Sequence, residues 1–202
     1  MRIVRKAGGA PVRLGILSGA FHPPTCAHLA LAQSALDTTE ADEVLFVLPA
    51  VFPHKSYEGV SLEQRLDLLE AATAHDPRYS IAVSEGGLFL EIARECRSLY
   101  GAGATLRFIC GRDTAERIVN WSYTGQPPIE AQLAEYELLV AARQGVYESP
   151  AHLRGVIHEL AVNGEYDDVS STEVRDRIAH GLVWEHLVPE PIVRRVIELY
   201  RK

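Results

Sequence analysis

One stretch decides how this chain folds, and it reads Leu14-Gly15-Ile16-Leu17-Ser18-Gly19-Ala20-Phe21-His22-Pro23-Pro24-Thr25-Cys26-Ala27-His28-Leu29. It begins apolar, as a buried strand does, and breaks at Gly19 and at the Pro23-Pro24 pair. Helical spacing then follows, with Leu29, Ala32 and Leu36 on one face. A strand, a tight loop and a helix start gather backbone N–H groups and the positive end of a helix dipole at one point, which suits a phosphate. His28 falls in the first helical turn, within reach of the same phosphate.

The bulk composition is that of one soluble globular domain spanning residues 1–202, with 47% hydrophobic and 23% charged residues. Within it, residues 1–12 are expected to be an irregular lead-in and residues 168–202 a helical C-terminal part. The 20 basic and 27 acidic residues give a net charge of −7, which argues against binding to nucleic acid or to an anionic membrane. No apolar run is long enough for a bilayer, and no signal-peptide pattern follows the basic start. The odd cysteine count predicts reduced thiols in a cytoplasmic protein.

Strand-like and helical segments alternate along most of the chain. Such alternation predicts an α/β fold with a parallel sheet and helices on both faces. The clearest helix is 61–74, which opens with a Ser61-x-x-Gln64 capping box, whereas 120–132 is expected to be a surface loop. Two helices separated near Pro189 and Pro191 are expected at the C-terminus, with Trp184 as a packing residue. The strand-like runs are 14–17, 44–48, 81–83, 106–110, 138–142 and 156–160.

Two segments far apart in the chain carry the same kind of signal. The stretch 19–28 resembles the Gly-x-Phe-x-Pro-x-(His/Thr)-x-x-His signature of the nucleotidyltransferases with a (His/Thr)-x-x-His motif. Val169-Ser170-Ser171-Thr172-Glu173-Val174-Arg175 resembles the Ile-Ser-Ser-Thr-x-x-Arg motif of that family. The family fold is Rossmann-like, in agreement with the alternation of strands and helices.

Three further matches narrow the resemblance to the nicotinate and nicotinamide mononucleotide adenylyltransferases. Pro53-His54-Lys55 resembles their Pro-His-Lys loop, and Leu187-Val188-Pro189 resembles their closing Leu-Val-Pro. Phe108-Ile109-Cys110-Gly111-Arg112-Asp113, followed by Trp121, resembles their Phe-Ile-x-Gly-x-Asp…Trp segment. The five matches occur in family order over about residues 14–200, which is hard to obtain by chance.

The second motif also has a physical interpretation of its own. Ser170 is placed to head a helix, with Glu173 closing a capping box, so the hydroxyls of Ser171 and Thr172 lie beside free N–H groups. Arg175 follows one turn later and adds a planar fork of donors for phosphate oxygens. Two helix starts are therefore expected to grip one polyphosphate from two sides, with Lys55 as a third cation.

The resemblance implies a set of roles for individual residues. It implies ATP plus a mononucleotide as substrates, with Mg²⁺ held through the ATP phosphates rather than by protein ligands. Catalysis is assigned to His28, Arg175 and Lys55. On the ATP side Gly19, Phe21, Thr25, His28, Ser171, Thr172 and Arg175 are implied, with Gly111 and Asp113 at the ribose. On the acceptor side the residues are Ser18, His54, Lys55 and Trp121, whose indole suits a flat cationic ring.

Direct transfer is the expected mechanism: the mononucleotide phosphate attacks the α-phosphorus of ATP and pyrophosphate departs. Two alternatives stay open, namely another phosphorylated acceptor and an ATP-binding regulatory protein without turnover. Individually, Arg175 is also compatible with a solvated helix residue, Asp113 with a plain N-cap and Trp121 with a packing aromatic.

Two segments depart from the family pattern. Residues 84–94 lack the hydroxyl-rich sequence that many bacterial members use for the pyridine nucleotide, and they carry Glu85 and Glu91, which would disfavour a nicotinate carboxylate. Residues 122–132 have no clear counterpart. The choice between nicotinate and nicotinamide, and a homo-oligomeric state, are left open by the sequence.

Overall fold

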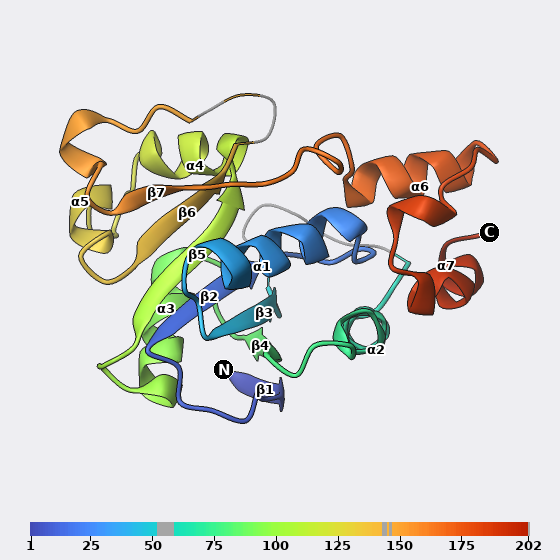
Figure 1. Ribbon diagram of the computed structural model, residues 1–202, viewed down its shortest axis with the longest axis horizontal. Helices are drawn as coiled ribbons and strands as arrows, with labels where there is room; N and C mark the ends of the chain where they lie inside the picture. The colour runs from blue at the N-terminus through green and yellow to red at the C-terminus, as the bar shows by residue number, and fades with distance from the viewer. Residues whose placement is uncertain (52–58, 143–144, 146, 202) are drawn as a thin grey trace.

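The centre of the protein is one seven-stranded, mostly parallel sheet (Figure 1). The computed structural model describes residues 1–51, 59–142, 145 and 147–201. In spatial order the strands are β1 (Arg2–Arg5), β4 (Tyr79–Ser84), β3 (Glu43–Pro49), β2 (Arg13–Ser18), β5 (Thr105–Gly111), β6 (Glu137–Ala141) and β7 (Ile157–Leu160). All neighbours from β4 to β7 pair in parallel, and β1 joins β4 antiparallel.

Helices cover both faces of this sheet, as expected from the alternation in the sequence. They are α1 (Cys26–Thr38), α2 (Leu62–Thr73), α3 (Phe89–Tyr100), α4 (Arg112–Val119), α5 (Ile129–Gln132), α6 (Ser171–Ala179) and α7 (Val193–Tyr200). One face packs against α3, α4 and α5, and the other against α1 and α2. No helix among the described residues is both long enough and apolar enough to cross a bilayer.

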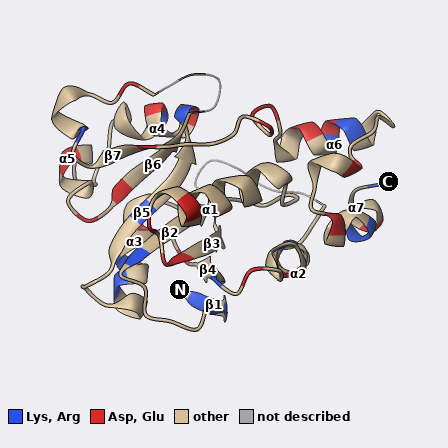
Figure 2. Cartoon of the chain, viewed as in Figure 1, with Lys and Arg blue, Asp and Glu red and all other residues tan. Residues whose placement is uncertain are grey.

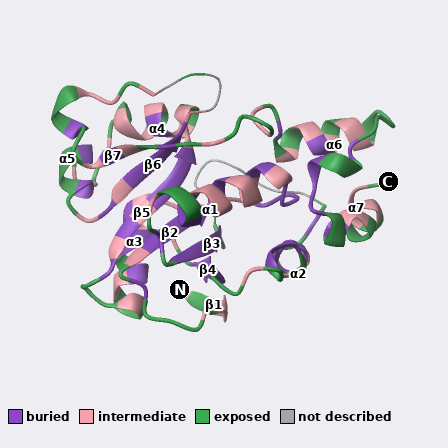
Figure 3. Cartoon of the chain, viewed as in Figure 1, coloured by how far each residue is buried: buried purple, intermediate pink, exposed green. Residues whose placement is uncertain are grey.

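The two faces arise from the alternation of side chains along each strand. In β3, Leu45 and Val47 point into the α3–α4–α5 core, whereas Val44, Phe46 and Leu48 point into the α1–α2 core. A strand between two helical layers is apolar along its whole length, and β3 is buried at every position (Figure 3). Short apolar runs were therefore the right signal for the six parallel strands.

The strand order fixes where a ligand is expected. Among the parallel strands the chain winds outward from β2 in one direction to β3 and β4, and then from β5 in the other direction to β6 and β7. The order reverses between β2 and β5, and ligands of open α/β sheets bind outside the carboxyl ends of the strands at such a reversal. Here those ends are Ser18 and Gly111.

The expected lead-in at residues 1–12 is partly wrong, because residues 2–5 form β1 at the edge of the sheet. A strand of four residues is too short to give a periodic signal. The Arg5 side chain fixes it in place, since its guanidinium donates to the carbonyls of Glu70, Thr73 and Tyr79 and to the Thr73 hydroxyl. Two of these carbonyls belong to the last turn of α2, where backbone carbonyls have no hydrogen-bond partner within the helix.

The other local expectations hold except one at α6, where Ser170 is the N-cap but Glu173 closes no capping box, because its carboxylate pairs with Arg177. Ser61 and Gln64 form the capping box of α2, and the turn at residues 101–103 follows α3, with Gly101 at φ +82°. The expected loop 120–132 holds one short helix, α5. At the C-terminus α6 and α7 pack on α2 through a third apolar cluster that includes the buried Trp184. Acidic and basic residues are interspersed along α6 and α7 (Figure 2).

Replacing Arg5 with Ala is expected to lower the free energy of unfolding by about 2 kcal/mol, because several charge-assisted hydrogen bonds to α2 and β4 are lost together. Urea denaturation followed by circular dichroism measures it. Arg2→Ala, at an exposed position of the same strand, is the matched control. Equal stability of the two variants would contradict the assigned role of Arg5.

Candidate active site

A cleft of about 230 Å³ opens at the carboxyl ends of β2 and β5, where the strand order reverses. It combines residues from four parts of the chain. The residues whose polar groups or backbone line it are Ser18, His28, Gly111, Thr114, Ser170 and Ser171. The predicted residues Ser18, His28, Gly111 and Ser171 therefore lie around one cavity, although 153 positions separate the first from the last.

The Thr-x-x-His spacing is explained by a hydrogen-bonded first turn of α1. Thr25 is the N-cap, and its backbone N–H donates to Nδ1 of His28 at 3.0 Å. The Thr25 hydroxyl lies 2.7 Å from the same nitrogen. Because Nδ1 accepts, the proton of the neutral ring belongs on Nε2. Thr25 thus fixes both the orientation and the tautomer of His28, with the ring N–H at Nε2.

The ring of Phe21 packs against the ring of His28. Its ring is 1% exposed and meets the His28 ring edge-on, with 5.1 Å between centroids. Phe21 adopts a φ of +46°, a left-handed conformation that is unfavourable for a side chain other than glycine and is held here by packing. The Gly19 N–H donates to the Val47 carbonyl at 3.0 Å, so this amide extends the sheet rather than facing the cleft.

The second motif docks directly on the loop of the first. Ser171 Oγ donates to the Pro23 carbonyl at 2.7 Å, and Nη1 of Arg175 donates to the His22 carbonyl at 2.6 Å. The same guanidinium also donates to the Ser171 carbonyl at 3.1 Å and to Oγ1 of Thr172 at 3.2 Å. The two distant segments therefore meet at one place, as expected, and the charge of Arg175 is fixed at the first turn of α6.

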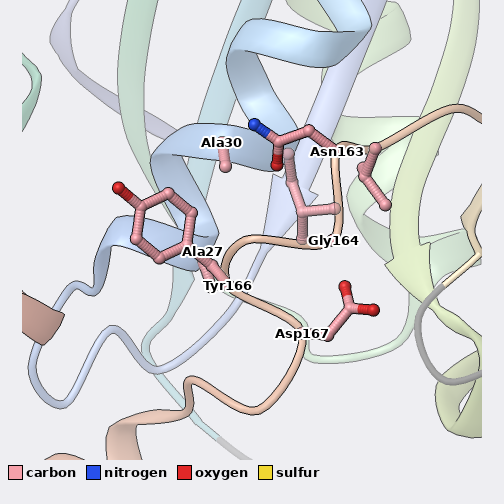
Figure 4. A pocket seen from close by; sticks show the side chains of 8 residues that line it. Ala27, Ala30, Asn163, Gly164, Tyr166 and Asp167 are labelled. Carbon is pink, nitrogen blue, oxygen red and sulfur yellow. The ribbon is translucent and has the colours of Figure 1, made fainter.

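The segment between β7 and α6 makes this docking possible. It crosses beside α1, where Tyr166 and Asp167 share a small cavity with Ala27 and Ala30 (Figure 4). That cavity is only about 20 Å³, far too small for a nucleotide. The crossing brings Ser170, the N-cap of α6, to the mouth of the cleft, where its hydroxyl accepts from the Glu173 N–H at 3.1 Å. The Glu173 carboxylate pairs with Arg177 at 2.5 Å.

Two further side chains hold the loop between β2 and α1. Nη1 of Arg65, on α2, donates to the Ala20 carbonyl at 3.0 Å. A hydrogen bond of 2.6 Å joins Nδ1 of His22 to the hydroxyl of Tyr200, at the end of α7. Burial raises the pKa of Tyr200, so its hydroxyl stays neutral. Neither Arg65 nor Tyr200 belongs to one of the motifs, so sequence reasoning did not identify this support.

The β5 side of the cleft is formed by backbone. Gly111 is the N-cap of α4, and a Cβ placed there would meet nothing within 4 Å, so a ligand has open access. Asp113 is exposed in the first turn of α4 and lies outside the residues that line the cleft. The alternative that Asp113 is the N-cap is wrong, because Gly111 holds that position.

A second cavity of about 330 Å³ adjoins the first. Phe89 and Thr114 line both, so the two spaces share a wall. Trp121, which is 49% exposed, lines the second cavity together with Leu88, Tyr123 and Tyr136. Trp121 is therefore placed beside the cleft but not inside it.

The divergent segment 84–94 forms part of this second cavity through Gly87, Leu88 and Phe89. Glu91 is turned back on its own helix start, where Oε2 accepts from the N–H groups of Gly87 and Leu88, each at 3.0 Å. A Cβ at Gly86 would come within 2.6 Å of Glu91, so glycine is needed for this close approach. The carboxylate of Glu91 is thus used as a cap of α3.

His54 and Lys55, predicted on the acceptor side, lie outside the described residues. Cys110 lines the cleft, but burial raises the pKa of its thiol to about 12, so the thiol is neutral and a poor nucleophile. Sequence reasoning missed Thr114 and Phe89 as cavity residues. The helical spacing of Thr114 and Ile118 would have identified the α4 wall.

Two helix starts facing one cleft of a doubly wound sheet define a protein that binds the phosphates of a nucleotide. A family model described as cytidylyltransferase-like matches residues 16–177. The chain is 31% identical to a probable nicotinate-nucleotide adenylyltransferase of Exiguobacterium sibiricum over 193 residues, covering 93% of this chain and 96% of that protein. A protein with the same description from Geobacter sulfurreducens is 31% identical over 216 residues, with the same coverage. The chain thus belongs to the cytidylyltransferase-like family, within the group of the nicotinate-nucleotide adenylyltransferases, as the motifs predicted.

Solved structures agree on the fold. Plasmodium falciparum nicotinic acid mononucleotide adenylyltransferase complexed with NaAD superimposes with a TM-score of 0.73 at 14% identity, covering 93% of this chain and 98% of that one. The same enzyme complexed with APC gives a TM-score of 0.72, covering 92% of this chain and 94% of that one. The Rossmann-like fold expected from the sequence is confirmed.

Removing the Tyr200 hydroxyl (Tyr200→Phe) is expected to raise the KM for ATP about fivefold, because a hydrogen bond that holds the His22 loop is lost. Steady-state kinetics with varied ATP measures it. Tyr100→Phe is the matched control, since it removes a hydrogen bond of the same 2.6 Å length, to Glu43 at the opposite end of the sheet. The same KM for ATP in both variants would show that Tyr200 acts on stability alone.

Proposed function

We propose that this chain transfers AMP from ATP to the phosphate of nicotinate or nicotinamide mononucleotide and releases pyrophosphate, a step of NAD biosynthesis. The observation that carries the proposal is the pair of adjoining cavities, one lined by both phosphate-binding motifs and the other by aromatic rings. The descriptions of the relatives support the same reaction. ATP would occupy the cleft at Ser18 and Gly111, and the pyridine ring the cavity at Trp121.

The reaction needs alignment and neutralisation of charge more than acid–base chemistry. The acceptor phosphate is an anion at neutral pH and needs no general base. One of its oxygens attacks the α-phosphorus of ATP, the bond from that phosphorus to the bridging oxygen of the β-phosphate breaks, and pyrophosphate leaves with the electron pair. Phe89 and Thr114 line both cavities, so the cavities adjoin. This supports the geometry of the reaction, because two substrates in adjoining cavities would lie end to end.

His28 is assigned to the developing charge on the α-phosphate. Its Nδ1 accepts from Thr25, so the ring donor that we assign to a phosphate oxygen is Nε2–H. Ser171 and the N–H groups at the start of α6 would hold the phosphates from the other side, with the positive charge of Arg175 behind them. Thr172, Asp113 and Lys55 keep the roles that the family resemblance implies.

Mg²⁺ is proposed as the companion of ATP. Within residues 1–51, 59–142, 145 and 147–201, no three His, Cys, Asp or Glu side chains are grouped to hold a metal ion. The hydroxyl, imidazole and guanidinium groups of the cleft fit an ion that arrives on the phosphates, as Mg²⁺ commonly does. When bound, it would supply neutralisation of the triphosphate charge. The free thiols Cys26, Cys96 and Cys110 support a cytoplasmic location, and a homo-oligomer stays a proposal.

Pyrophosphate release with ATP and Mg²⁺ across a panel of phosphorylated acceptors tests the proposed reaction. Nicotinate or nicotinamide mononucleotide is expected to give the highest kcat/KM, because four aromatic rings line the second cavity. Faster turnover of phosphopantetheine or another phosphorylated acceptor would replace the pyridine nucleotide. ATP binding without pyrophosphate release for any acceptor would favour a regulatory protein.

His28→Ala is expected to lower kcat about 100-fold or more, because a donor to the transition-state charge is removed. Steady-state assays of pyrophosphate release measure kcat, and circular dichroism checks that the variant is folded. His75→Ala is the matched control, because His75 is exposed at the end of α2, away from the cleft. An unchanged kcat in His28→Ala would refute the assigned role.

A further inference from the structure

Three polar side chains that line the second cavity are hydrogen-bonded within the protein. Among its rings, the Tyr123 hydroxyl donates to the Ile118 carbonyl at 3.0 Å and the Tyr136 hydroxyl donates to Oε1 of Gln132 at 3.2 Å. Nε2 of Gln132 donates to the Pro127 carbonyl at 2.8 Å. These groups are satisfied within the protein, so they offer a ligand mainly flat, apolar surface.

The backbone donors on the α3 side are also taken. Gly87 and Leu88 line the cavity, but both of their N–H groups donate to the Glu91 carboxylate. The absence of a side chain at Gly86 leaves room for Glu91 in that position. A carboxylate on a ligand would therefore find no free N–H at these two residues, and would meet the negative charge of Glu91 behind them.

Arg117 is the one charged side chain among the described residues that line this cavity. It makes no hydrogen bond or ion pair with any described residue. Neighbouring arginines differ, since Arg112 pairs with Glu116 at 2.7 Å and Arg94 pairs with Glu135 at 2.8 Å. A guanidinium beside an aromatic cavity, with no partner in the described part of the chain, is suited to an anionic group of the ligand.

The position of Arg117 on α4 indicates which anionic group. Thr114 lies on the wall shared with the ATP cleft, and Arg117 lies one turn further along the same face, about 4.5 Å along the helix axis. Trp121 lies just beyond the end of α4 and lines the same cavity as Arg117. The acceptor phosphate must approach the cleft in order to react, which leaves Arg117 beside the ring end of the acceptor.

We propose that Arg117 determines acceptor specificity by binding the carboxylate of a carboxylated pyridine ring that stacks on Trp121. The inference rests on the proposed function and specifies it further. A planar guanidinium can donate two parallel hydrogen bonds to a carboxylate, whereas the neutral amide of the nicotinamide ring offers one acceptor and no charge. The enzyme then selects nicotinate mononucleotide over nicotinamide mononucleotide.

The test compares kcat/KM for the two mononucleotides at saturating ATP in the wild type, Arg117→Gln and Arg117→Lys. In Arg117→Gln the ratio of nicotinate to nicotinamide kcat/KM is expected to fall at least tenfold, as for loss of a charge-assisted pair. In Arg117→Lys this ratio is expected to fall less, because lysine keeps the charge but lacks the planar fork of donors. Arg94→Gln, at an exposed arginine of α3 outside the cavity lining, is the matched control and is expected to keep the wild-type ratio.

The outcomes separate the two proposals. An equal loss of kcat/KM with both acceptors in Arg117→Gln would place Arg117 at their common phosphate and overturn the inference. An unchanged ratio of the two kcat/KM values would also overturn it, as would a wild-type preference for the nicotinamide compound. If the wild type uses only the nicotinate compound, a fall of tenfold or more in its kcat/KM in Arg117→Gln, with an unchanged KM for ATP, supports the inference. A smaller fall overturns the inference. Turnover of neither mononucleotide by the wild type would instead refute the proposed function.

Discussion

The docking of α6 on the loop between β2 and α1 is the contact on which the site depends. Ser171 and Arg175 donate to the carbonyls of Pro23 and His22, so residues almost 150 positions apart become one structure. A tight loop before a helix exposes carbonyls that its own backbone cannot satisfy. Satisfying them from α6 brings a second helix start, and with it a second set of N–H donors, to the same cleft.

The same contact explains why the C-terminal part is arranged as it is. The helices α6 and α7 are too short to be stable alone, and they gain stability by packing Val174, Trp184 and Val196 against α2. From α2, Arg65 supports the loop at Ala20, and from α7, Tyr200 supports it at His22. The loop is therefore held from three helices, which keeps Phe21 in its unfavourable left-handed conformation beneath His28.

Local patterns predicted the local structure well, and ordered motifs predicted the cleft. The six parallel strands, the α2 cap and the Thr25–His28 turn all depend on residues close in the sequence, so spacing alone identifies them. The edge strand β1 could not be found this way, because it is held by Arg5 and by pairing with β4, far along the chain. Arg65, Tyr200 and Arg117 were missed for the same reason, since their importance comes from what lies opposite them in space.

The concern that Glu91 would repel an acidic acceptor illustrates the difference between a residue and its environment. From sequence alone, a carboxylate in the acceptor segment counts against a carboxylated ligand. In the fold, that carboxylate is bound by two N–H groups at the start of α3, where the helix dipole stabilises it. Among the described residues that line the cavity, the one charged side chain is then Arg117 on α4, the helix that also carries the shared residue Thr114. Because the N–H donors at the start of α3 are taken, the proposed recognition of the acceptor carboxylate falls to Arg117 on α4, the helix whose Thr114 also lines the ATP cleft.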